Sequence, residues 1–239
     1  MRAYPNARGE RIGSVATDGS AVSLDFDRVE THDLVKLFGP TPALAGVSLR
    51  FDAGTITVVE GPNGSGKTTL LAILALLARP SQGEVRFGAH EPRRRPALRG
   101  QIGFLGHAAM VYPDLSGEEN LALCAALYRL AWGGAELARA RERFGLGPWL
   151  ARPTRTYSRG QLQRVALARA LMHAPRLVLL DEPSTGLDEA SADRLVRAVK
   201  DERARGAIVV AVTHDAVFAE ALADQRVRLD AGRVAGAAS

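Results

Sequence analysis

Short apolar runs alternate along the chain with longer segments in which apolar and charged residues mix. Two unbroken apolar runs predict parallel strands covered on both faces: RLVLL (176–180) and AIVVAV (207–212). The apolar run TITVVE (55–60) predicts a further strand. The segment 68–78 is apolar enough to predict a buried helix. In the segment 190–205 leucine and valine alternate with charged residues, which predicts a second helix, and Gly206 is its typical C-terminal cap. GEVRFG and QIGFLG predict short strands, and QRVRLDAGRV predicts a closing hairpin. This alternation is typical of an α/β fold.

Two capping boxes predict helix starts in the middle of the chain. Ser116 with Glu119 precedes NLALCAALYRLA, and Ser158 with Gln161 precedes VALARALMHA, which must end by Pro175. We therefore expect a helical insertion over about residues 107–170 of an α/β core. Residues 1–27 are rich in Gly, Ser, Ala and charge without periodicity, and they predict a flexible N-terminal tail before a domain of residues 28–239.

Composition narrows the class of protein only slightly. The chain is 46% hydrophobic and 24% charged, as in an ordinary soluble globular protein, and its net charge is +5. Only three of its 31 basic residues are lysines, a bias that codon usage explains as well as an anionic partner does. The single cysteine, Cys124, excludes an internal disulfide. The longest apolar run, residues 70–78, is too short to cross a membrane.

The stretch GPNGSGKTT (61–69) lies between a predicted strand and a predicted helix. Gly61, Gly66, Lys67 and Thr68 satisfy the pattern G-x-x-x-x-G-K-[ST] in the strand-to-helix context that this motif requires. Glycines let backbone N–H groups turn toward phosphate oxygens, and the helix N-terminus adds its positive dipole end. We expect Lys67 to bind the β- and γ-phosphates of a nucleotide and Thr68 to ligate Mg²⁺. The alternative is a simple glycine-rich turn.

An acidic pair follows the predicted strand RLVLL. Asp181 and Glu182 lie at the carboxyl edge of that strand, where α/β sheets bind ligands. Asp181 is suited to hold Mg²⁺ through its water shell, and Glu182 is suited to orient and polarise an attacking water. A solvated strand end is the alternative, and the phosphate loop in the same chain argues against it.

A third motif, YSRGQLQRV, precedes the acidic strand. Its Ser158, Gly160 and Gln161 resemble the signature loop LSGGQ of the ABC transporter ATPases. The phosphate loop, the acidic pair, STGLD and VTHD with His214 occur in that family's order, and Phe38 matches its adenine-stacking aromatic. The resemblance covers about residues 28–235. Tyr157 and Arg159 depart from the usual Leu and Gly, and His107 stands where the family commonly has glutamine.

The resemblance implies the fold, cofactors and partners of that family. The fold is the phosphate-loop ABC ATPase fold, with a mostly parallel core sheet, an antiparallel β part and a helical subdomain. The cofactors are ATP and Mg²⁺, with Thr68 and Asp181 as metal-binding residues and Glu182, His214 and Lys67 as catalytic residues. The implied ATP contacts are Phe38, Gly61, Pro62, Asn63, Gly64, Ser65, Gly66, Lys67, Thr68, Thr69, His107, Ser158, Gly160 and Gln161.

The resemblance also implies a head-to-tail homodimer, in which Lys67 of one copy and Ser158 of the other enclose ATP. Integral-membrane permease subunits would dock near residues 107–130, so the chain would be peripheral to the cytoplasmic side of the inner membrane, and no nucleic-acid partner is expected. Several of the implied residues have simpler alternatives: Phe38 or His214 in the core, Ser158 as a helix cap only, and His107 as a solvent-facing strand end.

Two longer stretches, 103–130 and 154–183, are similar to the ATPase subunit of the heme exporter used in cytochrome c maturation, and Gly106-His107 is part of this similarity. The similarity implies a motor for heme export that does not itself bind heme. The alternatives are an exporter of drugs, lipids or polysaccharides, a soluble ABC ATPase acting on ribosomes or DNA, and a nucleotide-binding module without turnover.

Overall fold

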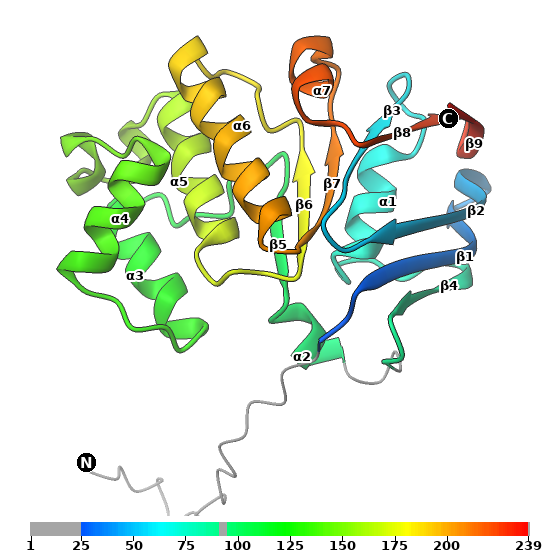
Figure 1. Cartoon of the computed structure of the whole chain (residues 1–239), viewed down its shortest axis with the longest axis horizontal. Coiled ribbons are helices and arrows are strands. Elements are labelled where there is room, and N and C mark those ends of the chain that lie inside the picture. The colour runs from blue at the N-terminus through cyan, green and yellow to red at the C-terminus, as the bar shows by residue number, and fades with distance from the viewer. Residues whose placement is uncertain (1–24, 91–94, 239) are drawn as a thin grey trace, which may run out of the picture.

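The structure is a computed structural model that describes residues 25–90 and 95–238. It contains a six-stranded sheet and a smaller three-stranded sheet, with α1 between them and the longer helices on the far side of the larger sheet (Figure 1). The predicted α/β plan is confirmed by this arrangement, which combines a mostly parallel core sheet with an antiparallel part and helices.

The larger sheet has the order β5-β6-β7-β3-β8-β9, and its strands are parallel except for the closing pair β8–β9. Every residue of β6 and β7 is buried, because helices cover both faces of these central strands. The predicted parallel strands and the closing hairpin are therefore confirmed. The strands are β3 (Ile56–Glu60), β5 (Ile102–Leu105), β6 (Leu177–Asp181), β7 (Ile208–Val212), β8 (Gln225–Asp230) and β9 (Arg233–Ala238).

The smaller sheet is antiparallel, in the order β2-β1-β4. Its apolar face packs on α1 and forms one core with β3, β6 and β7. GEVRFG is a strand as predicted, and it pairs with β1 rather than with the core sheet. The elements of this layer are β1 (Arg28–Phe38), β2 (Thr41–Asp52), β4 (Gln82–Phe87) and α1 (Lys67–Leu74).

Two boundaries differ from the predictions. The helix expected over 68–78 ends at Leu74, because the chain turns at Leu76 with a left-handed φ of 58°. Phe26, placed in the tail by the sequence, is only 4% exposed and meets Phe87 edge-on with ring centroids 5.5 Å apart. The folded part therefore begins before residue 28, since this aromatic side chain completes the core of the smaller sheet. Residues 1–24 of the predicted tail lie outside the described residues.

The helices beyond the other face of the core sheet include the two that were predicted from capping boxes. Ser116 and Ser158 each accept a hydrogen bond from the backbone N–H three residues on, and the side chains of Glu119 and Gln161 bond back to the capping residues. The helices of this side are α3 (Gly117–Leu127), α4 (Gly134–Phe144), α5 (Arg159–Leu171), α6 (Glu189–Ala204) and α7 (Ala216–Leu222), with short turns at Pro148–Ala151 and Thr154–Thr156; the short α2 (Arg95–Arg99) precedes β5. No helix within the described ranges is long and apolar enough to cross a membrane.

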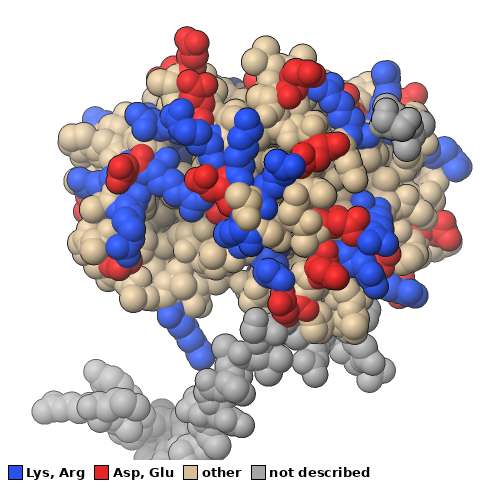
Figure 2. Space-filling view, in the orientation of Figure 1, with Lys and Arg blue, Asp and Glu red and all other residues tan. Residues whose placement is uncertain are grey.

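Basic and acidic side chains are interleaved over the face that carries α4 and α6 (Figure 2). Many of the arginines there are paired with a carboxylate: Arg139 with Glu136, and both Arg143 and Arg205 with the buried Glu202. Carboxylates therefore neutralise much of the arginine charge locally on this face.

Candidate functional site

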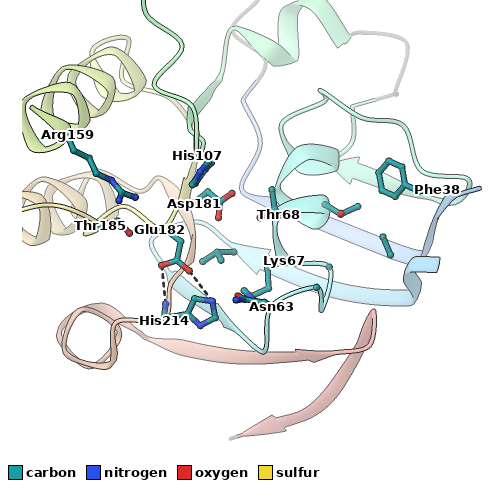
Figure 3. A pocket seen from close by; sticks show the side chains of 15 residues that line it. Phe38, Asn63, Lys67, Thr68, His107, Arg159, Asp181, Glu182, Thr185 and His214 are labelled. Atoms are coloured by element: carbon teal, nitrogen blue, oxygen red, sulfur yellow. Dashed lines mark hydrogen bonds and ion pairs between the residues drawn. The ribbon is translucent and has the colours of Figure 1, made fainter. Parts of the chain in front are cut away.

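A cavity of about 850 Å³ opens at the carboxyl ends of the parallel strands, above the phosphate loop (Figure 3). Segments distant in sequence meet there: the end of β1, the loop into α1, and the loops after β5, β6 and β7. Most of the predicted site residues line it: Phe38, Asn63, Gly64, Gly66, Lys67, Thr68, Thr69, His107, Asp181, Glu182 and His214.

Close backbone approaches fix the phosphate loop in place. Gly61 has φ 146°, and a Cβ at this position would lie 2.0 Å from the carbonyl oxygen of Leu229. Gly66 has φ 100°, and its Cβ would lie 2.3 Å from the carbonyl oxygen of Ala43. The N–H of Gly232 also donates to the carbonyl of Ser65 at 3.1 Å. The loop is therefore held between β2 and the β8–β9 turn, and only glycine fits at its two ends.

The three remaining predicted residues of the phosphate loop lie beside or beneath the cavity. Gly61 and Pro62 border a neighbouring hollow that shares His214 with the cavity, and Ser65 is a buried residue of the loop, with 2% exposure. The carbonyls of Gly61 and Pro62 accept hydrogen bonds from the Lys67 ammonium at 2.7 and 2.8 Å. Burial lowers the pKa of Lys67, while the charges of Glu182 and Asp181 act in the opposite direction. A desolvated cation is thus held at the floor of the cavity.

Asp181, the last residue of β6, is 5% exposed. Burial raises the pKa of its carboxyl, and a hydrogen bond with the Thr68 side chain and the nearby His107 and Lys67 oppose that rise. Carboxylate and hydroxyl oxygens at this contact are hard ligands of the kind that Mg²⁺ binds. The donor set formed by Thr68 and Asp181 therefore fits Mg²⁺.

Glu182 and His214 form the polar pair that Figure 3 marks with dashed lines. Glu182 Oε1 lies 3.4 Å from His214 Nε2, and Glu182 Oε2 accepts from the His214 backbone N–H at 3.2 Å. The backbone of Glu182 is left-handed (φ 50°), and its N–H donates to Val212 at 2.9 Å. This turn at the strand end directs the carboxylate sideways to the loop after β7. His214 is exposed, so the core-histidine alternative is wrong.

Phe38 and His107 lie on opposite walls of the cavity in Figure 3. The Phe38 ring, at the end of β1, is 59% exposed, with the Lys36 ammonium 5.2 Å from its centroid. The core alternative for Phe38 is therefore wrong, and its ring is free to stack on a ligand. His107 follows β5 and is close enough to Asp181 to lower the pKa of that carboxyl.

The signature-loop residues Ser158, Gly160 and Gln161 are absent from the lining of this cavity, all three lying in the described part of the chain. Ser158 and Gln161 form the capping box of α5, and Gly160 packs so closely on the loop after β6 that its Cβ would lie 2.8 Å from the carbonyl oxygen of Gly186. Ser158 therefore caps α5 within its own chain.

Four lining residues were not predicted as site residues: Ala43, Arg159, Thr185 and Val212. Thr185 belongs to the stretch STGLD, which the family resemblance had already singled out, so its position could have been inferred. Arg159 was noted only as a departure from the signature pattern. Ala43 is a small residue whose contribution depends on the folded backbone, and nothing in the local sequence marks it. Val212 ends the run AIVVAV and begins VTHD, so its position at the strand end could have been inferred.

Comparison with known proteins gives a consistent picture. Residues 44–185 match the ABC transporter family. The chain is 39% identical over 205 residues to the daunorubicin resistance ATP-binding protein DrrA3 of Streptomyces coeruleorubidus, which covers 83% of this chain and 64% of that protein. It is 38% identical over 209 residues to the cytochrome c biogenesis ATP-binding export protein CcmA of Rhodospirillum rubrum, covering 86% of this chain and 89% of that one. The chain thus spans a little under two thirds of the length of the daunorubicin-resistance relative.

A solved structure has the same architecture. The dimeric post-hydrolysis state of the ATP-binding cassette MJ0796, bound to ADP and Pi, superposes with a TM-score of 0.78 at 29% identity, covering 87% of this chain and 97% of that one.

Proposed function

Because the chain belongs to the ABC transporter family and carries its ATPase domain, we propose that it binds ATP with Mg²⁺ in the cavity above the phosphate loop and hydrolyses it to drive transport. The observation that carries this proposal is the convergence of three groups on one cavity: the Lys67 cation, the Thr68–Asp181 oxygen pair and the Glu182–His214 pair. A phosphate-binding turn alone would not need a carboxylate positioned by a second polar group.

The phosphate loop and Phe38 would bind the nucleotide. Backbone N–H groups of residues 61–69 and the N-terminus of α1 would bind the phosphates. The Lys67 ammonium, which donates to the carbonyls of Gly61 and Pro62 in this structure, would donate to the β- and γ-phosphates instead. The exposed ring of Phe38 would stack on adenine. Thr68 and Asp181 would hold Mg²⁺, which neutralises phosphate charge when bound.

Hydrolysis would depend on Glu182. Its carboxylate, held on both oxygens by His214, is placed to orient and polarise the attacking water. His214 would also contact the γ-phosphate, which gives it a second function besides holding Glu182. His107, beside Asp181, would link this end of the cavity to the helical lobe, which is formed by α3, α4 and α5.

The signature loop points to a second copy of the chain. Ser158, Gly160 and Gln161 do not line the cavity of their own chain, which supports a head-to-tail homodimer in which they contact the partner's nucleotide. Exposed apolar side chains within residues 107–130 would supply a docking surface for membrane permease subunits: Met110, Tyr112 and Leu127 are 52%, 61% and 76% exposed. The chain would then be peripheral to the cytoplasmic side of the inner membrane. The ion-paired arginines of the α4–α6 face give no support to a nucleic-acid partner.

For the cargo, we propose heme, exported for cytochrome c biogenesis. Support comes from the cytochrome c biogenesis relative, which the chain covers over 89% of its length, and from glycine-histidine at residues 106–107. Export of a drug such as daunorubicin is the second candidate, favoured by the equally similar resistance protein.

One experiment separates the two cargoes. Cells lacking this chain are given back the wild type or Glu182→Gln, then denatured membrane proteins are stained for covalently bound heme and growth is measured with daunorubicin. Heme staining that is lost in the deletion strain and restored only by the wild type supports heme export. Normal staining together with drug sensitivity overturns heme in favour of drug export.

A further inference from the structure

Arg159 brings a second cation into the cavity of its own chain. It is the first residue of α5, and its side chain enters the cavity from the side of the helical lobe, whereas Lys67 lies beside the phosphate loop (Figure 3). The same side chain borders a small recess of about 70 Å³ whose other walls include His107, Asp181 and Glu182. Arg159 therefore faces the end of the cavity that carries the proposed hydrolytic groups.

Gly186 allows the side chain to take this path. The aliphatic part of Arg159 crosses directly over this residue: a Cβ on Gly186 would lie 2.9 Å from Arg159 Cδ and 3.0 Å from Cγ. Gly186 has φ 77°, a conformation that glycine adopts without strain. Gln163, one turn further along α5, donates to the carbonyl of Pro183 at 3.0 Å. The start of α5 and the loop after β6 are thus packed together within one chain, and this packing aims the guanidinium at the cavity.

The charges around the cavity indicate what Arg159 would bind. The negative charges of Asp181 and Glu182 are balanced in part by the positive charge of Lys67. Arg159 forms no ion pair with a carboxylate of the described residues. A guanidinium can give two parallel N–H bonds to a phosphate, which suits it to a terminal phosphoryl group.

We propose that Arg159 binds the terminal phosphate of the ATP held by its own chain, as a second cation that distinguishes ATP from ADP. The proposal rests on the nucleotide site proposed above, because it assigns a further contact within it. It differs from the role of the neighbouring signature-loop residues, which are expected to serve the partner's nucleotide.

The test uses the non-hydrolysable analogue AMP-PNP and ADP, titrated into dilute protein whose oligomeric state is measured by light scattering at the same concentrations. The variants are Arg159→Gln and Arg159→Lys, with Arg152→Gln as the control that removes an exposed arginine of the same lobe outside the cavity lining. Glutamine preserves helix propensity and leaves the Ser158–Gln161 capping box intact, and circular dichroism checks the fold.

We expect Arg159→Gln to weaken AMP-PNP binding by about tenfold, the low end for a hydrogen bond to a charged group, with ADP binding nearly unchanged. Arg159→Lys should give a smaller loss, and Arg152→Gln none. Equal weakening of AMP-PNP and ADP, or no weakening of either, would overturn the proposal. A loss that occurs only where the protein is dimeric would also overturn it, because the arginine would then act on the partner's nucleotide. Wild-type protein that binds neither nucleotide would overturn the proposed site itself.

Discussion

The most quantitative prediction concerns His173, just beyond the end of α5. Its ring stacks on Tyr128 with centroids 3.8 Å apart and planes 7° apart, and its Nε2 lies 3.2 Å from the carbonyl oxygen of Ile102 in β5. Its Nδ1 is buried and has no hydrogen-bond partner in the described part of the chain. Burial is the main cause that lowers the pKa of His173 to about 4, with the charges of Arg169 and Arg205 acting in the same direction.

The lowered pKa makes stability depend on pH in a defined window. An unfolded histidine has a pKa of about 6.5, so between about pH 6.5 and pH 4 the unfolded chain binds a proton that the folded chain does not. The stability due to neutral His173 is therefore present above pH 6.5 and is lost as the pH falls. The loss is about 2 kcal/mol on going from about pH 7.5 to pH 5, and about 3 kcal/mol by pH 4.

The assay compares wild type with His173→Gln by urea unfolding across this range. Glutamine keeps an N–H donor for the Ile102 carbonyl but does not titrate. The variant loses the stacking on Tyr128, which should lower its free energy of unfolding by the same amount at every pH. We expect the wild type to lose about 2 kcal/mol relative to the variant between about pH 7.5 and pH 5. A stability difference that is constant with pH would refute the reasoning.

Two further predictions follow from close packing and from a buried amide. Gly61→Ala should destabilise the fold by about 3 kcal/mol and abolish tight ATP binding, because the new Cβ collides with Leu229. Gly206→Ala, also at positive φ but with nothing within 4 Å of its Cβ, should cost only about 1–2 kcal/mol and leave ATP binding unchanged; thermal unfolding and nucleotide titration check both. Asn120 is 6% exposed, and its side chain accepts from the Tyr112 N–H at 2.7 Å and donates to three carbonyls, the shortest contact being 2.9 Å to Ser116. Asn120→Ala should cost about 2 kcal/mol in urea unfolding and Asn120→Asp more, because a carboxylate would face those carbonyls; equal stabilities of the two variants would contradict this account.

The sequence predicts elements well where one local signal defines them. The unbroken apolar runs identify β6 and β7, and the capping boxes place the starts of α3 and α5. It does not locate β1 and β2, because register shifts such as that between Thr31 and Leu34 interrupt the alternation of a regular strand. Nor does it show that β4 belongs to a different sheet from β5, since sheet membership depends on pairing between distant segments.

The candidate site follows the same division. Lys67, Thr68 and Asp181 are predictable because each belongs to a short motif at the boundary of a predicted element. Lys67 and Thr68 begin a helix, and Asp181 ends a strand. The contact between Glu182 and His214 is not, because it requires β6 and β7 to be neighbours and Glu182 to adopt a left-handed backbone. The path of Arg159 into its own cavity depends in turn on the close approach to Gly186, which no local pattern records.

The central claim is that Glu182 drives hydrolysis of ATP bound at this cavity. The most direct measurement is phosphate release from ATP by purified protein, with and without Mg²⁺, for the wild type, Glu182→Gln and the control Glu189→Gln, which makes the same chemical change at an exposed residue of α6. We expect Mg²⁺-dependent release by the wild type and by Glu189→Gln. Release by Glu182→Gln should be slower by at least about a hundredfold, the usual contribution of a positioned general base, with ATP binding retained. Release by Glu182→Gln at the wild-type rate would contradict the account.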